Sequence, residues 1–188
     1  MEKKEARTEI KRRLKSLTNE ERKTKSEKAL ELLVSLEEFR TARVLLLFVS
    51  MDDEIDTLPT ILHALNNNKQ VILPKCRMED HELILCPVNS IDDLAPGAYG
   101  ILEPTTNASI AASELDFILL PARAFDEQGN RLGRGAGFYD RLLSDCSLNA
   151  TLCGIAYEEQ ILPSVPNDSH DKRVDIVVTD HRVRQCHA

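Results

Sequence analysis

The chain is poor in the residues and patterns that mark several classes of protein. Seven glycines and eight prolines in 188 residues are ordinary numbers, and they exclude collagen-like and low-complexity chains. The five cysteines are odd in number and show neither a C-x-x-C pair nor, with histidine, zinc-finger spacing. We therefore expect these cysteines to be reduced thiols that pack inside a cytosolic protein. The five are Cys76, Cys86, Cys146, Cys153 and Cys186.

No long hydrophobic run is present either. A membrane-spanning helix needs about 18 or more apolar residues, and no segment approaches that length. The N-terminal segment lacks the apolar centre of a secretory signal, and Glu2, Glu5 and Glu9 interrupt the basic residues that a mitochondrial address would need. We therefore expect a protein of the cytoplasm that does not contact a membrane.

Positive charge is scarce outside the first part of the chain. The net charge is −7, yet residues 1–43 carry 13 Lys and Arg against 9 Asp and Glu, and the remainder carries 11 against 22. An acidic body argues against a nucleic-acid binder, which would show a steep salt dependence through the basic segment. That segment is either a solvated helix face or a surface that attracts phosphate.

Residues 1–43 are expected to form two amphipathic helices. Apolar residues recur at helical spacing in the first, and Lys3, Arg7 and Lys11 follow an adjacent stripe. The pair Thr18 and Glu21 is a capping-box signal that predicts the start of the second helix. The expected apolar faces are Ala6, Ile10, Leu14 and Leu17, and then Ala29, Leu33, Leu36 and Phe39.

From residue 44 onward, short apolar runs alternate with polar stretches. Such runs suit strands buried on both faces of a mostly parallel sheet. The expected strands are 44–49, 71–73, 83–85, 117–120, 152–156 and 174–178, with helices at 57–67 and 138–146 and an irregular, turn-rich segment at 87–114. The pattern predicts a single domain over residues 1–188, with a three-layer α/β/α body at 44–188.

The segment 122–141 is a long strand-to-helix connection, a kind of loop that is usually functional. Gly133, Gly135 and Gly137 alternate in it, which lets the backbone turn its amides inward as an anion cradle before the next helix. The loop matches neither a Walker A motif nor G-x-G-x-x-G. From the glycines alone, a plain tight turn is an equally good interpretation.

Three carboxylates could act with this loop. Asp140, in the first turn of the predicted helix, could bind Mg²⁺ beside phosphates or could only stabilise the helix dipole. Asp175 interrupts an apolar strand, where a charge must be paired or ligated. Glu54 follows a strand at the carboxyl edge of the sheet, where α/β proteins bind ligands. Sequence alone does not separate it from its acidic neighbours Asp52, Asp53 and Asp56.

Four motifs, in this order, resemble the 5-formyltetrahydrofolate cyclo-ligase family, also called 5,10-methenyltetrahydrofolate synthetases. They are K-x-x-x-R from Lys3, S-M-x-D-E-I-x-T from Ser50, F-D-x-x-G-x-R-L-G-R-G-x-G-[YF]-Y-D from Phe125, and V-D-x-V-x-T from Val174. The resemblance covers essentially the whole chain. It implies a monomer of NagB/RpiA/CoA-transferase-like architecture that converts 5-formyltetrahydrofolate and ATP, with Mg²⁺, into 5,10-methenyltetrahydrofolate, ADP and phosphate.

The resemblance also implies a set of site residues. The implied ATP contacts are Lys3, Lys4, Glu5, Ala6 and Arg7, followed by Arg131, Leu132, Gly133, Arg134, Gly135, Ala136, Gly137, Phe138 and Tyr139. The implied substrate contacts are Arg7, Val49 and Glu54, together with Arg134, Gly135, Ala136, Gly137 and Phe138. Asp140 and Asp175 match magnesium ligands, and Arg134 and Asp140 are expected to be catalytic.

These residue types suit the implied chemistry. Phosphorylation of the formyl oxygen creates a leaving group, after which N10 closes the ring, so positioning and charge neutralisation are needed and a covalent nucleophile is not. Glu54 can accept paired hydrogen bonds from the pterin edge. Phe138 or Tyr139 could pack on a ring, or one of them could be a core residue.

Some features leave alternatives open. Ala136, Phe138 and Ala122 depart from residues common in the family, but activity is still expected because the carboxylates are intact. The other candidates are a sugar-phosphate isomerase or CoA-transferase relative, which needs no ATP, and a folate-binding relative without turnover. The narrow apolar stripe of the first helix predicts mobility in the empty protein. His170 is expected to be a surface-loop histidine rather than a phosphate ligand.

Overall fold

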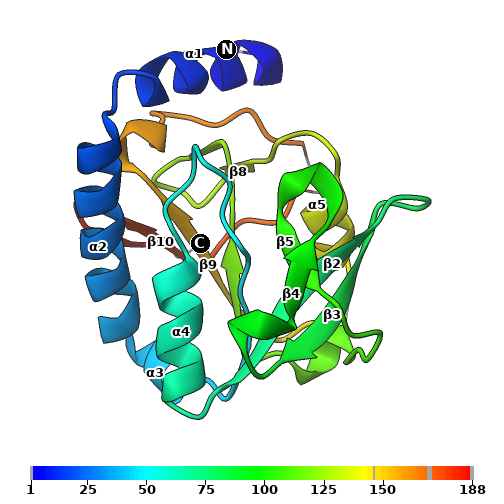
Figure 1. The fold of residues 1–188 in the computed structure, drawn as a ribbon. Helices are drawn as coiled ribbons and strands as arrows, with labels where there is room; N and C mark the ends of the chain where they lie inside the picture. The colour runs from blue at the N-terminus through cyan, green and yellow to red at the C-terminus, as the bar shows by residue number, and fades with distance from the viewer. Residues whose placement is uncertain (1, 146, 169–170, 187–188) are drawn as a thin grey trace.

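The computed structural model describes residues 2–145, 147–168 and 171–186, which form layers around a central sheet (Figure 1). The predictions for Cys146 and His170 lie outside these residues. The helices are α1 (Lys3–Leu14), α2 (Asn19–Ser35), α3 (Glu37–Thr41), α4 (Leu58–Asn66) and α5 (Phe138–Leu143), with 3-10 turns at Ile91–Asp93, Ala98–Gly100, Ala112–Glu114 and Glu158–Gln160. In the described part of the chain, no helix is both long and apolar enough to cross a membrane.

The sheet has seven strands among the described residues, in the order β11-β10-β9-β6-β1-β2-β3. They are β1 (Val44–Leu46), β2 (Gln70–Arg77), β3 (Glu82–Val88), β6 (Phe117–Leu120), β9 (Thr151–Ala156), β10 (Ile176–Thr179) and β11 (Val183–Gln185). The inner pairs are parallel, whereas the edge strands β3 and β11 are antiparallel to their neighbours. The predicted mostly parallel α/β fold is therefore confirmed, and β11 is a strand that the apolar runs did not predict.

The second helix is shorter than its apolar pattern predicts. Thr18 caps it as expected, with the Glu21 amide donating to the threonine hydroxyl at 3.2 Å. Leu36 has an extended backbone, which ends α2 and begins the separate helix α3. The break directs Phe39 onto the sheet, where its ring meets that of Phe117 edge-on at 5.5 Å. The predicted apolar face is buried, but its residues belong to two helices, α2 and α3, rather than to one.

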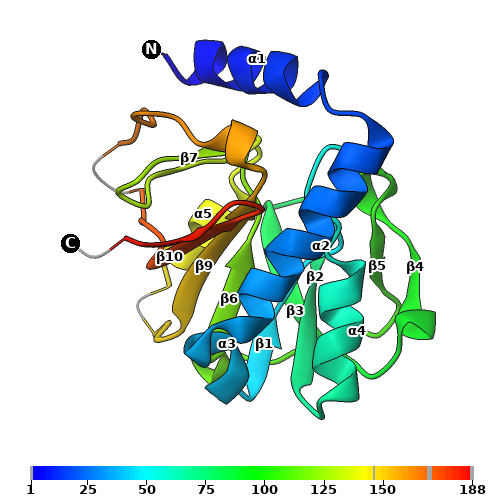
Figure 2. The same cartoon turned by 90° about the vertical axis from the view of Figure 1, so that its left-hand side faces the viewer.

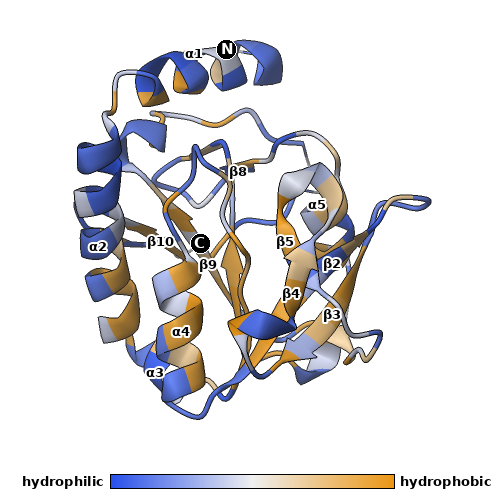
Figure 3. Ribbon diagram, viewed as in Figure 1, coloured by the Kyte–Doolittle hydropathy of each residue, from blue (hydrophilic) through white to orange (hydrophobic). Residues whose placement is uncertain are grey.

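Two apolar layers cover the two faces of the sheet. Helices α2, α3 and α4 pack on one face and α5 packs on the other, while the apolar side of α1 joins the first of these layers at the edge of the sheet. Figure 2 shows α2 and α4 in front of the strands, and Figure 3 shows hydrophobic colour concentrated in the sheet and on the helix surfaces beside it. The removal of these side chains from water is the main stabilising contribution, at roughly 25 cal/mol for each Å² of apolar surface.

Helix α1 lies across the carboxyl edge of the sheet rather than beside its strands (Figures 1 and 2). Its predicted apolar residues Ala6, Ile10 and Leu14 are fully buried there. Arg13 donates to the backbone oxygens of Glu159 and Ile161, just beyond β9. The predicted stripe is thus confirmed as a packing face, while the mobility of α1 without ligand stays a prediction.

The turn-rich segment 87–114 is more regular than predicted. It contains a hairpin of β4 (Leu94–Pro96) and β5 (Leu102–Pro104), which lies beside β2. At the tip, Tyr99 has a positive φ of 56° and is 58% exposed. A second small antiparallel pair, β7 (Ala124–Phe125) with β8 (Arg131–Leu132), leads into the glycine loop. These two ribbons frame the carboxyl edge of the sheet.

Candidate active site

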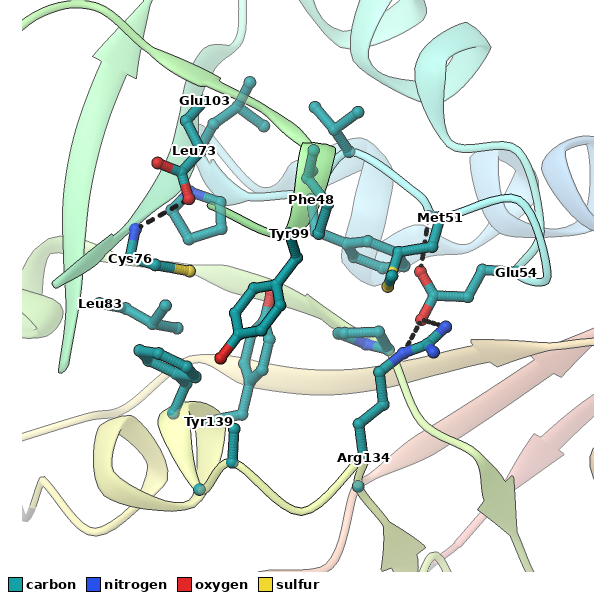
Figure 4. A pocket seen from close by; sticks show the side chains of 18 of the residues that line it. Phe48, Met51, Glu54, Leu73, Cys76, Leu83, Tyr99, Glu103, Arg134 and Tyr139 are labelled. Carbon is teal, nitrogen blue, oxygen red and sulfur yellow. Dashed lines mark hydrogen bonds and ion pairs between the residues drawn. The ribbon is translucent and has the colours of Figure 1, made fainter. Parts of the chain in front are cut away.

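A cavity of about 390 Å³ opens at the carboxyl edge of the sheet (Figure 4). Its walls come from the loop after β1, the β2–β3 ribbon, the β4–β5 hairpin and the loop that precedes α5. The lining is mostly apolar, as in most small-molecule sites. Its charged residues are Glu54, Glu103, Arg131, Arg134 and Asp140.

Most of the predicted glycine-loop contacts meet in this cavity. Arg131 and the whole segment 133–140 line it, together with Val49 and Glu54 from the loop after β1. Leu132 does not, because its side chain is buried in the apolar core. The structure therefore brings two distant parts of the chain to one cavity, as expected for the predicted substrate contacts.

Glu54 is held by its own turn and by a buried tyrosine. The amide of Met51 donates to Glu54 Oε2 at 2.9 Å, and the Glu54 amide donates back to the Met51 oxygen at 3.0 Å. The hydroxyl of Tyr157 donates to the Glu54 backbone oxygen at 2.9 Å. The Glu54 side chain is only 8% exposed. This carboxylate is consequently fixed at the cavity wall.

Arg134 reaches across the cavity mouth to two carboxylates. Its Nε and Nη2 donate to Glu54 Oε1 at 2.9 and 2.7 Å, and Nη2 also donates to Asp53 Oδ1 at 2.5 Å. Asp53 in turn accepts from Arg123. Burial acts to raise the pKa of Asp53, but the hydrogen bonds from Arg134 and Arg123 outweigh it and leave this pKa below its ordinary value.

The glycine loop needs its glycines for backbone conformation and is tied to α1. Gly135 and Gly137 have φ values of 112° and 80°, a region that strains other residues. Arg7 donates its Nε–H to the Gly133 oxygen at 2.9 Å. The guanidinium of Arg7 also lies beside Gly135. The predicted contacts of α1 and of the loop therefore meet at Arg7.

The other residues of the first predicted ATP segment lie in different environments. The ammonium of Lys3 pairs with Asp168 at 2.7 Å and with Asp171 at 3.0 Å. The hydrogen bond to Asp168 raises the pKa of Lys3, against a smaller opposing effect of burial. Lys4 and Glu5 are exposed, and Ala6 is buried in the core. Among the charged residues of this segment, Lys3 and Arg7 are thus the two whose side chains contact the body.

Asp140 lies on the cavity wall with a buried partner. Its carboxylate pairs with Arg131, whose side chain is 5% exposed and also donates to the Pro121 oxygen at 3.4 Å. The Asp140 side chain is 56% exposed, so it can accept further ligands. Among the described residues, the buried Arg131 Nε lacks a hydrogen-bond partner. One accessible carboxylate beside a cationic wall suits Mg²⁺ that is shared with phosphate oxygens.

The structure does not bring Asp175 next to Asp140. Asp175 precedes β10, and its Oδ2 accepts from the Leu152 amide at 2.7 Å near the start of β9. This is the amino end of both strands, whereas the cavity lies at the carboxyl edge. Within the described residues, no group of three or more His, Cys, Asp or Glu side chains could hold a metal ion.

Several cavity residues were not predicted from the sequence. Tyr99 stands over the opening from the hairpin tip, and Cys76 lies on the β2 wall (Figure 4). Burial, and then the nearby Glu103, raise the pKa of the Cys76 thiol to about 12, so the thiol is neutral. Glu103 itself accepts from the Cys76 amide at 3.2 Å. Tyr99 and Glu103 belong to a hairpin in a segment that was expected to be irregular, and Cys76 lies beyond the end of the expected strand 71–73, so the sequence did not indicate these positions.

The two aromatic residues at the start of α5 both face the cavity. Burial raises the pKa of the Tyr139 phenol well above its ordinary value, so the hydroxyl stays protonated. Phe138 is 8% exposed, and its ring lies 5.3 Å from that of His81. Phe138 is therefore buried and Tyr139 partly buried, and both line the cavity.

Comparison with known proteins gives a consistent result. The model of the 5-formyltetrahydrofolate cyclo-ligase family matches residues 1–180. The 5-formyltetrahydrofolate cyclo-ligases of Mus musculus and Escherichia coli K12 are each 30% identical, over 92% and 93% of this chain and 90% and 98% of their own lengths. The solved structure of Aquifex aeolicus 5,10-methenyltetrahydrofolate synthetase is similar over 100% of this chain and 94% of its own, with 36% identity and a TM-score of 0.87.

Proposed function

The chain belongs to the 5-formyltetrahydrofolate cyclo-ligase family, and from this premise we propose that it converts 5-formyltetrahydrofolate into 5,10-methenyltetrahydrofolate at the cavity described above. ATP is the co-substrate and leaves as ADP and phosphate. The observation that carries the proposal is the meeting of Glu54 with Arg134 at one cavity wall, because it joins the predicted pterin acceptor to the predicted phosphate-binding loop.

The cavity suits a two-step reaction. The formyl oxygen attacks the γ-phosphate of ATP and displaces ADP, and N10 then attacks the activated carbon, loses its proton to solvent and expels phosphate as the ring closes. Glu54 would accept hydrogen bonds from the pterin edge, while Arg134 and the amides of the glycine loop would bind the transferred phosphate. The apolar wall would hold the pterin and limit the access of water. These steps require oriented charge and no covalent nucleophile.

The nucleotide is assigned to the junction of α1 and the glycine loop. Arg7 touches this loop, and Lys3 lies one turn away on the same helix face. Lys3 would exchange its aspartate partners for phosphate oxygens when ATP arrives. Leu132 and Ala6 would contribute through their backbone and packing, since both side chains are buried.

Magnesium is proposed at Asp140. Its accessible carboxylate on the cavity wall fits an ion that takes its remaining ligands from phosphate and water. The ion would neutralise charge on the phosphate oxygens, and Arg131 would keep the carboxylate in place. Asp175, the second ligand that the resemblance implies, has its carboxylate at the amino end of β10, away from the cavity, so we place the ion at Asp140 and leave the role of Asp175 to a magnesium titration.

The assembly and location of the protein are also proposals. We propose a monomer, as the resemblance to the family implies. The four described cysteines are free thiols, which supports a reducing compartment such as the cytoplasm.

The experiment mixes purified protein with 5-formyltetrahydrofolate and Mg²⁺, with and without ATP, and follows the near-ultraviolet absorbance of the conjugated methenyl product. We expect a rise that depends on ATP. In Glu54→Gln, loss of hydrogen bonds to a charged acceptor should raise the KM for 5-formyltetrahydrofolate by roughly 10- to 100-fold. Binding without turnover would indicate a folate-binding relative, and turnover of a sugar phosphate without ATP would indicate an isomerase.

A further inference from the structure

A run of four alternating charges borders the cavity. Arg123 donates to Asp53, Asp53 accepts from Arg134, and Arg134 donates to Glu54. Arg134 and Glu54 belong to the proposed reaction, whereas no role has been given to the first two residues. Asp53 is one of the two central residues of the turn between Met51 and Glu54 and directly precedes Glu54, so the same turn determines its position.

Arg123 is a firm anchor for this run. Its side chain is 19% exposed, and its amide donates to the Leu132 oxygen at 2.7 Å. The Gln160 amide group donates to the backbone oxygens of Ala122 and Arg123 at 2.8 and 3.2 Å. Gln160 itself is 2% exposed. The guanidinium that holds Asp53 therefore projects from a backbone fixed on two sides.

The two carboxylates that hold Arg134 differ in their expected fate. Under the proposed function, on which this step rests, the pterin edge takes hydrogen bonds from Glu54. The hydrogen bonds from Arg134 to Glu54 would then weaken, because the pterin edge and the Arg134 guanidinium compete for Glu54 Oε1. Asp53 is half-buried and faces Arg134 and Arg123, so it can retain Arg134 when Glu54 is engaged.

We propose that Asp53 is a positioning residue, which keeps the Arg134 guanidinium beside the reacting phosphate after the substrate has occupied Glu54. Asp53 touches no reacting atom in this scheme and acts only through Arg134. Arg123 holds Asp53 in the orientation that this requires. An arginine without such support would adopt many rotamers. A charge that is already oriented stabilises the transition state more than a charge that must first be ordered.

The test is a double-mutant cycle on kcat, with Asp53→Asn and Arg134→Gln made singly and together. Asp53→Asn should lower kcat by about 10- to 100-fold, as expected for a misplaced transition-state contact, and change the KM for 5-formyltetrahydrofolate less than threefold, since Glu54 is intact. In the Arg134→Gln background the same change should lower kcat by less than about twofold, because non-additivity marks residues that act together.

Asp52→Asn is the matched control, since Asp52 is exposed and its carboxylate makes no hydrogen bond among the described residues. It should retain the kcat of the wild type. If Asp53→Asn does not fold, as judged by near-ultraviolet circular dichroism, Arg123→Lys replaces it and should give the same non-additive loss. Equal losses of kcat in both backgrounds would overturn the proposal. A wild type that forms no methenyl product would instead reject the proposed function.

Discussion

The Nε–H of Arg7 donates a hydrogen bond of 2.9 Å to the backbone oxygen of Gly133, and so joins the first helix to the loop that borders the cavity. The two residues are 126 positions apart. A change in α1 is therefore transmitted directly to the loop. Helix packing and loop conformation should respond together when ATP binds.

The first prediction concerns Arg7. Arg7→Gln removes a charged donor to Gly133, a type of bond worth about 1.5–3 kcal/mol. We expect the KM for ATP to rise at least about 10-fold and the amide exchange of α1 in the empty protein to become faster. Steady-state kinetics and hydrogen exchange measure the two effects.

Lys11→Gln is the control for Arg7, because Lys11 is exposed one turn further along α1 and has no side-chain hydrogen bond in the described structure. Lys11→Gln should change neither the KM for ATP nor the rate of amide exchange in α1. If ATP leaves the exchange of α1 unchanged and slow in the wild type, the predicted mobility of the empty protein is wrong.

The second prediction compares Asp140 with Asp175. Asp140→Asn should lower kcat and raise the Mg²⁺ concentration needed for half-maximal activity, because it weakens the proposed ligand. Asp175→Asn should destabilise the fold by about 1 kcal/mol, through its bond to the Leu152 amide, without a change in the Mg²⁺ requirement. Magnesium titrations of activity provide the measurement. A raised Mg²⁺ requirement in Asp175→Asn would instead support the second ligand that the resemblance implies.

The third prediction is a pH dependence of stability. Pairing with Arg134 and Arg123 holds the pKa of Asp53 below its ordinary value, despite the opposing effect of burial. This stabilisation is complete above the unfolded pKa of about 3.9 and is lost as the pH falls through the lower folded pKa. Urea titrations should give a constant difference in the free energy of unfolding between wild type and Asp53→Asn from pH 5 to 8. Below about pH 4 the difference should shrink. A difference independent of pH would contradict the assignment.

The fourth prediction concerns Asp126, a fully buried carboxylate. It accepts from the amides of Gln128, Asn130 and Val165 at 3.1, 2.9 and 2.8 Å, and from the Asn130 side chain at 2.8 Å. Asp126→Asn would turn the side-chain NH₂ group of asparagine toward N–H groups that need an acceptor. It should lower the free energy of unfolding by about 3–5 kcal/mol.

The control for Asp126 is Glu127→Gln. The Glu127 side chain is 46% exposed, and Arg184 keeps its second partner Glu158 when Glu127 changes. We expect a loss below about 1 kcal/mol in the same urea titration. If the two variants lose the same free energy of unfolding, the buried Asp126 carboxylate makes no specific contribution to stability.

The parallel core could be predicted because its strands are buried on both faces. All four residues of Phe117–Leu120 are buried, which matches a continuous apolar run. The edge strand Val183–Gln185 escaped prediction, since it has three residues and two of them are polar. Its pairing comes from β10 beside it rather than from its own composition. The break at Leu36 was hidden for a similar reason, because the apolar spacing continues across it while the backbone does not.

The candidate site could be predicted as a set of residues but not as a set of contacts. Motifs identified Glu54 and Arg134, yet their ion pair spans 80 positions and depends on how two loops fold back over the sheet. The pairing of Lys3 with Asp168 spans 165 positions and had no local signal. Asp53 was only one of four neighbouring acids until the structure showed Arg123 beside it.

The docking of α1 places a constraint on synthesis. During synthesis, α1 leaves the ribosome before its partners Gly133, Glu159 and Asp168, which lie at least 126 positions further along the chain than the α1 residues they contact. A nascent chain therefore exposes the basic amphipathic helix until these partners have been made. Chains truncated before residue 130 should present the helix to proteases and chaperones, whereas chains that extend past Asp168 should protect it.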